Sequence, residues 1–196
     1  MAPHKHQLLL TEAIEREGEA QRQLLEGRAD VAHAEFAAAS ELYRQSWEAA
    51  HARAFGRLVG MLKASVLAGG GTDAAGYART ALADADPDSA TANYARALAA
   101  LIAGDDEDAR ALAARLQEAP EAFARTGRAI AALASRDAAA YATALEAIVR
   151  DFEQRSEHLT GVAIADTALM LQALAGRRRM AVAIDGPVLP ARGTVS

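Results

Sequence analysis

The amino-acid sequence predicts an all-α protein, built as an array of about four helical hairpins with a ninth helix and an extended tail. Three observations lead to this prediction. Hydrophobic residues make up 52% of the 196 residues but aromatic residues only 5%, because alanine supplies most of the apolar side chains. Alanine is the best helix former, and its short side chain lets helices pack closely. Apolar residues also recur at helical spacings, and glycine-to-proline units recur along the chain.

The two clearest repeat units begin at Gly71 and Gly104, which lie 33 positions apart, and each ends in a proline 16 positions later. They read GTDAAGYARTALADADP and GDDEDARALAARLQEAP, with an aspartate two positions after the glycine and a small residue five positions after it. Weaker copies begin at Gly27 and Ser135. A period of 31 to 44 residues with two helices per unit is typical of a helical-repeat array.

Each unit is predicted to form the second helix of a hairpin, because an amphipathic stretch precedes it. In one such stretch, Tyr94, Leu98 and Leu101 recur at spacings of four and three on one helical face. Ser46 is the candidate N-cap at the start of the second hairpin. The predicted hairpins cover residues 6–43, 46–87, 88–120 and 121–151, and the ninth helix covers roughly 162–174.

The end of the chain is predicted to close the array. A lone ninth helix can cover the exposed face of the last hairpin, as terminal helices do in solenoids. The segment from Met180 to Leu189 alternates apolar residues like a single strand, and it either packs along the helices or pairs with a second copy. The tail after Pro190 is predicted to be mobile. The run Arg177 to Arg179 is expected to oppose the dipole at the end of the ninth helix, or to contact an acidic partner.

This pattern resembles the tetratricopeptide repeat over roughly residues 6–154. In that family a glycine-aspartate pair joins the two helices of a unit, a small residue follows five positions later, and a proline ends the unit. The resemblance implies a right-handed α-α superhelix, with one repeat domain over residues 1–176 and an extended segment with its tail over 177–196. The residues that carry it are Gly104, Asp105, Ala109 and Pro120, and less closely Gly71, Gly76 and Pro87.

Four consecutive acidic residues, Asp105 to Asp108, are the densest group of possible metal ligands in the chain. They are predicted to begin a helix, where free backbone N–H groups and the helix dipole favour negative charge. Successive helical residues diverge by about 100°, so four adjacent carboxylates cannot converge on one ion. The stretch DADPDSATANYA resembles a calcium loop, but it has Ser89 and Ala95 where glycine and glutamate are needed. No metal or cofactor is predicted.

Composition excludes several classes of function. The net charge is −5, and this modest acidic excess argues against nucleic-acid binding, which normally needs a basic face. The chain contains no cysteine, so disulfides, thiolate metal sites and cysteine nucleophiles are excluded. No apolar run of 18 residues occurs, and the first residues lack the apolar core of a signal peptide. We therefore expect a cytoplasmic protein with no membrane partner.

The leading hypothesis for function is a non-enzymatic interaction module, a scaffold for an unidentified protein or peptide. Stacked hairpins present a groove along their first helices, and arginines on those helices could pair with carboxylates of a partner. Arg96 and Arg128 in particular are predicted to line that groove. The candidate partner-binding residues are Arg53, Arg57, Arg96, Arg125 and Arg128.

Two other hypotheses stay open. Glu157, His158 and Asp166 form the one carboxylate-histidine neighbourhood of note, and they would support a small-molecule-binding or enzymatic helical domain. A deep pocket holding His158 with a second titratable group would favour this hypothesis. The third hypothesis is a structural protein that self-associates through its alanine-rich faces or its extended segment, so the chain is expected to be a monomer or a homodimer.

Overall fold

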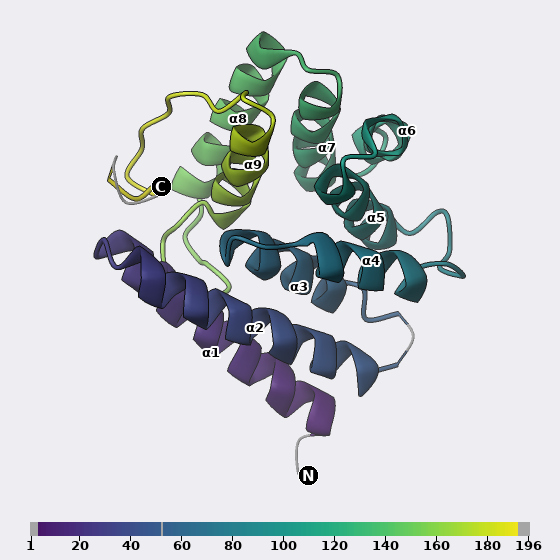
Figure 1. Cartoon of the computed structure of the whole chain (residues 1–196), viewed down its shortest axis with the longest axis vertical. Helices are drawn as coiled ribbons and strands as arrows, with labels where there is room; N and C mark the ends of the chain where they lie inside the picture. The colour runs from purple at the N-terminus through teal and green to yellow at the C-terminus, as the bar shows by residue number, and fades with distance from the viewer. Residues whose placement is uncertain (1–3, 52, 192–196) are drawn as a thin grey trace.

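The computed structural model describes residues 4–51 and 53–191, and within these ranges it contains nine α-helices and no strand (Figure 1). The all-α prediction is therefore confirmed for the described residues. None of their helices is both long enough and apolar enough to cross a membrane. The helices are α1 (Lys5–Leu25), α2 (Ala29–Glu48), α3 (Gly56–Leu67), α4 (Thr72–Ala81), α5 (Ala90–Ala103), α6 (Asp106–Gln117), α7 (Glu121–Ala134), α8 (Ala138–Glu153) and α9 (Asp166–Arg177).

Local capping signals set several helix boundaries where the sequence predicts them. Gly104 ends α5 in the left-handed conformation with φ 81°, which glycine adopts without steric cost. The side chain of Asp105 then accepts a hydrogen bond from the backbone N–H of Asp108 and caps α6. Asp137 caps α8 in the same way, accepting from the backbone N–H of Ala140 at 3.0 Å. The predicted capping role of the acidic run is confirmed for Asp105.

The start of the second hairpin differs from the prediction. Ser46 does not cap a helix, because α2 continues through it to Glu48 and α3 begins only at Gly56. The hydroxyl of Ser46 instead donates to the carbonyl of His6 at 2.6 Å and accepts from the Arg57 guanidinium at 2.7 Å. These contacts join the first turn of α1 to the end of α2 and the first turn of α3.

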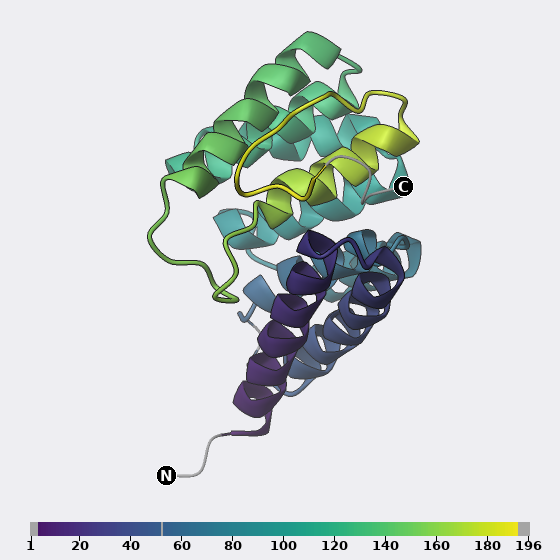
Figure 2. The same ribbon diagram turned by 90° about the vertical axis from the view of Figure 1, so that its left-hand side faces the viewer.

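Consecutive helices pack against one another along the chain, and α5 also packs against both α3 and α7. Figures 1 and 2 show α1 and α2 side by side at one end of the molecule and α7 and α8 at the other. The contacts of α3 with α5 and of α5 with α7 join the predicted first helices of successive hairpins. The larger hydrophobic cluster of the described residues includes residues of every helix from α1 to α9. A smaller cluster, which includes Leu24, Phe36 and Ala64, joins α1, α2 and α3.

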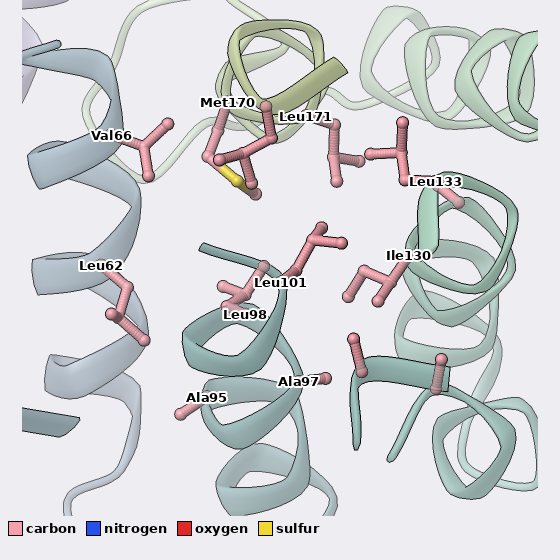
Figure 3. Close-up of a cluster of buried hydrophobic side chains, with 14 of the residues drawn as sticks. Leu62, Val66, Ala95, Ala97, Leu98, Leu101, Ile130, Leu133, Met170 and Leu171 are labelled. Carbon is pink, nitrogen blue, oxygen red and sulfur yellow. The ribbon is translucent and has the colours of Figure 1, made fainter. Parts of the chain in front are cut away.

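The ninth helix does more than cover the last hairpin. It contacts α7 and α8, but it also contacts α3, which lies far earlier in the chain. Figure 3 shows Met170 and Leu171 of α9 directed toward Leu98 and Leu101 of α5, between α3 and α7. Met170 and Leu171 are fully buried. The face that the first helices α3, α5 and α7 share is therefore occupied by the chain's own α9.

The arginines at the end of α9 bind the ends of other helices. Arg177 donates to the carbonyls of Gly69 and Gly70, at 3.3 and 2.7 Å, just beyond α3. Arg178 donates to the carbonyl of Leu101 in the last turn of α5 and to the Asp106 carboxylate. The prediction gave these cations a role at the end of α9 or with an acidic partner, whereas Arg177 and Arg178 also satisfy carbonyls at the C-terminal ends of α3 and α5.

The segment after α9 packs along the helices, which is the first of the two predicted alternatives. The carbonyl of Val182 accepts from the Gln172 side chain, and the carbonyl of Val188 accepts from the backbone N–H of Ala165 at 2.8 Å. The side chains of Met180 and Val188 are buried. Most of the tail after Pro190, which is predicted to be mobile, lies outside the described residues.

Candidate functional site

A groove of about 1010 Å³ opens between the first hairpin, the start of α3 and the loop that joins α4 to α5. Its walls combine aliphatic and aromatic side chains with charged ones. Arg53 and Arg57 line it beside the start of α3, and Asp84 and Asp86 line it from the loop. The apolar lining residues are Leu10, Ile14, Ala54, Phe55, Val59, Ala85 and Leu159.

A buried polar cluster lies at the inner end of this groove, and four helices contribute to it. Glu17 of α1 is only 2% exposed, and the hydroxyl of Tyr43 in α2 donates to its carboxylate at 2.6 Å. Lys63 of α3 forms a salt bridge with Asp166 of α9 at 2.5 Å, and both side chains are mostly buried. Glu17, Tyr43 and Lys63 all line the groove. We call these four residues the Glu17 cluster.

Gly60 is the residue that lets the Glu17 cluster form. A Cβ atom added at Gly60 would lie 2.8 Å from the ring of Tyr43, a distance that real Cβ contacts essentially never show. The absence of a side chain therefore lets the ring lie directly against α3, where its hydroxyl reaches Glu17. A buried phenol normally needs such a hydrogen-bond partner.

The environment of the Glu17 cluster decides which of its groups can titrate. Burial raises the pKa of Glu17 and the neighbouring Asp166 adds to this effect, although Lys63 and the hydrogen bond from Tyr43 oppose it. Burial by itself would lower the pKa of Lys63, but the carboxylates of Asp166 and Glu17 outweigh it and hold that pKa above its ordinary value. Lys63 therefore stays an ammonium ion and is a poor nucleophile or base. Among the three groups that line the groove, Glu17 is the proton-exchanging one.

A second hollow of about 260 Å³ lies on the other side of the Glu17 cluster. Lys63 and Leu159 line both hollows, and Asp166 lines the smaller one. His158 is partly buried there, with its ring 6.2 Å from that of Phe152. The structure thus brings His158 and Asp166 to one hollow, whereas Glu157 is exposed and does not line it.

Two of the five candidate arginines lie in the large groove. Arg53 is exposed, and Arg57 is held by the Ser46 hydroxyl at 2.7 Å and contacts the His6 ring nitrogen Nδ1 at 3.1 Å. Neither arginine forms a salt bridge with any described residue. Their positive charges therefore face the groove without a carboxylate within ion-pair distance.

The other three candidate arginines line neither hollow, and each has an acceptor within the chain. Arg96 and Arg128 were both predicted to line the binding groove, and neither lines the large groove. Arg96 donates to the carbonyls of Leu82 and Ala85, at 2.8 and 2.7 Å, and holds the loop before α5. Arg125 pairs with Asp151 and Arg128 pairs with Glu121, both at 2.6 Å. These three side chains bind acceptors elsewhere in the chain and lie outside the large groove, so the structure does not bring the five arginines together.

The acidic run at the start of α6 is likewise engaged within the chain. Arg79 of α4 pairs with Asp105 at 2.6 Å, and Asp106 pairs with Arg178 at 2.9 Å and with Arg136 at 3.4 Å. Across the part of the chain that the structure describes, no three histidine, aspartate or glutamate side chains are placed to hold a metal ion.

Glu17 is the main residue of this site that the sequence reasoning did not single out. It lies on the same helical face as Ala13, Ala20 and Leu24, which are all buried. A carboxylate inside an apolar stripe at spacings of three and four is a recognisable signal, because a buried acid requires partners. Comparison with protein-family models, with curated proteins and with solved structures finds no match to this chain.

Proposed function

We propose that this protein is a non-enzymatic interaction module that binds a segment of a partner protein in the large groove. The observation that carries the proposal is the groove itself, about 1010 Å³ with apolar walls and two arginines that lack salt-bridge partners among the described residues. Its volume is at the top of the range of about 300–1,000 Å³ that small-molecule sites occupy, which favours a peptide or helix. Arg53 and Arg57 would pair with carboxylates of that segment.

The tetratricopeptide-like superhelix is part of the same proposal, and the contacts of α3 with α5 and of α5 with α7 support it. In such an array the shared face of the first helices is a common binding surface. Here α9 occupies that face over α3, α5 and α7. The proposed partner site therefore lies beside α1 and the start of α3, where the groove remains open.

A peptide library displayed on phage tests this proposal. We expect selected peptides to carry an acidic residue next to apolar ones and to bind the purified protein in isothermal titration calorimetry. Replacing Arg53 and Arg57 together by alanine should weaken binding roughly tenfold, because each exposed ion pair contributes about 0.2–1 kcal/mol. Arg128→Ala is the matched control, since Arg128 is an exposed arginine outside the groove. Peptides that bind both arginine variants equally well would contradict the proposal.

A small-molecule-binding or enzymatic domain is the second candidate, and one observation favours it. His158 and Asp166 line the same hollow of about 260 Å³, together with Lys63 and Tyr94. A histidine and a carboxylate in one cleft are a common pair in acid-base chemistry. Chemical shifts of the His158 ring during a screen of small polar compounds test this candidate, and a ring that responds to none of them would count against it.

A further inference from the structure

The Glu17 cluster contains two carboxyl groups but a single cation. The ammonium of Lys63 lies 2.5 Å from Asp166, on the side of the smaller hollow. The carboxyl of Glu17 is hydrogen-bonded by Tyr43, and no described lysine, arginine or histidine lies within ion-pair distance of it. A buried carboxylate without its own counter-ion is costly. With both carboxyl groups ionised the cluster lacks one positive charge, and because the pKa of Glu17 is raised, a proton on Glu17 makes up this shortfall when no ligand is bound.

The groove around Glu17 has the shape and lining that a long basic side chain needs. Leu10 and Ile14 of α1 and Val59 of α3 line the same groove as Glu17. Lysine and arginine carry an aliphatic stem that packs on apolar surface and a charged head that seeks a carboxylate. The arrangement of an apolar wall leading to one nearly buried acid matches that side-chain chemistry.

We propose that the inner end of the large groove binds one basic side chain of the partner segment, whose charged head pairs with the Glu17 carboxylate. This inference rests on the proposed interaction function and names the anchor residue of the partner. The segment would then place a lysine or arginine toward Glu17 and a carboxylate toward Arg53 and Arg57. A partner segment with a basic residue and a carboxylate at this spacing would bind at both ends of the groove, at Glu17 and at the two arginines.

Binding of the basic group is coupled to release of a proton. The groups that face Glu17 are Tyr43 from α2, Lys63 from α3 and Asp166 from α9. Burial and Asp166 favour the protonated form of Glu17, and an arriving cation favours the ionised form. Affinity for the cation therefore rises with pH across the titration of Glu17, whereas a neutral ligand shows no such rise.

The experiment uses hexylammonium as the probe, with hexanol and hexanoate as probes of equal chain length but different charge. Each is titrated into the full-length protein and followed by backbone amide shifts in NMR spectra. We expect hexylammonium to shift the amide signals of Gly60 and Tyr43 at a lower concentration than hexanol does, with hexanoate weakest at these two residues. Glu17→Gln should weaken hexylammonium binding about tenfold or more, because a charge-assisted hydrogen bond is lost. Glu107→Gln makes the same chemical substitution at an exposed position outside the groove, so it should leave hexylammonium binding unchanged.

Two results would overturn this inference. Hexylammonium could bind Glu17→Gln as well as the unmodified protein, or hexanoate could shift Gly60 and Tyr43 at a lower concentration than hexylammonium does. Circular dichroism of each variant shows that a change in binding does not reflect unfolding. The two proposals can fail separately. If hexylammonium binds but no peptide is selected from the phage library, only the interaction function is contradicted. If peptides are selected and bind Glu17→Gln as well as the unmodified protein, only the pairing of a basic side chain with Glu17 is contradicted.

Discussion

Gly127 lies inside α7, where that helix packs against α6, and its replacement by alanine should destabilise the protein. The added Cβ would lie 2.9 Å from the Cβ of Leu116 and 3.0 Å from the carbonyl oxygen of Ala113. Neither atom is the end of a flexible side chain, so the two helices must move apart. Overpacking of this kind costs about 1–3 kcal/mol, against which the better helix propensity of alanine returns about 1 kcal/mol. We expect a net loss of about 1 kcal/mol.

Gly76 provides the matched control for this substitution. It also lies inside a helix, α4, but a Cβ added there meets no atom within 4 Å. Only the propensity effect remains, so Gly76→Ala should stabilise the protein by up to about 1 kcal/mol. The same chemical change is thus expected to have opposite signs at two positions, with a difference of about 2 kcal/mol between the variants.

Urea denaturation followed by far-UV circular dichroism measures both changes. The slope of the unfolding free energy against urea should be equal in the three proteins, so that shifts in midpoint report stability. If Gly127→Ala stabilises the protein as much as Gly76→Ala does, α6 and α7 do not approach as closely as described, and the reasoning is refuted.

Three further predictions concern the core. Lys63→Met leaves the Asp166 carboxylate buried without its partner and should lower the free energy of unfolding by about 3 kcal/mol at pH 7. The double variant Lys63→Met with Asp166→Leu should lose much less, and equal losses in urea denaturation would argue against a buried pair. Because the pKa of Glu17 is raised on folding, the free energy of unfolding should fall as the pH rises from about 4.3 through that raised value. Glu17→Gln should remove this fall, so parallel pH profiles of the urea midpoints of the two proteins would contradict the prediction. Leu171→Ala should lower the free energy of unfolding by about 3 kcal/mol because Leu171 is fully buried. Leu159 is 76% exposed, so Leu159→Ala should lower it by less than about 0.5 kcal/mol in the same assay. A similar loss at both sites would place α9 outside the core.

Helix boundaries set by neighbouring residues are the part of the fold that could be predicted well. Gly104 ends α5 and Asp105 caps α6 because the left-handed glycine and the capping carboxylate act within a few residues. Asp137 caps α8 in the same way. The physics of a cap is local, so a short stretch of sequence contains all of it.

Features that depend on distant residues could not be predicted in this way. Ser46 has the chemistry of a cap, but its hydroxyl bonds to His6, 40 positions earlier in the chain. Arg96 looks like a free charge in sequence until the carbonyls of Leu82 and Ala85 are placed beside it. The salt bridge of the Glu17 cluster joins Lys63 to a residue 103 positions later. Such positions follow from the packing of helices, and no local pattern contains that information.

The place of α9 has a consequence for biosynthesis. A ribosome synthesises α3, α5 and α7 before Asp166 has been added, so the buried side chains of Val66, Leu101 and Leu133 are made before the helix that Figure 3 shows facing them. A nascent chain at that stage exposes an apolar surface that is prone to aggregation. Completion of this core therefore waits for translation of α9, and a stop codon ahead of Asp166 should leave an aggregation-prone fragment instead of a shorter folded protein.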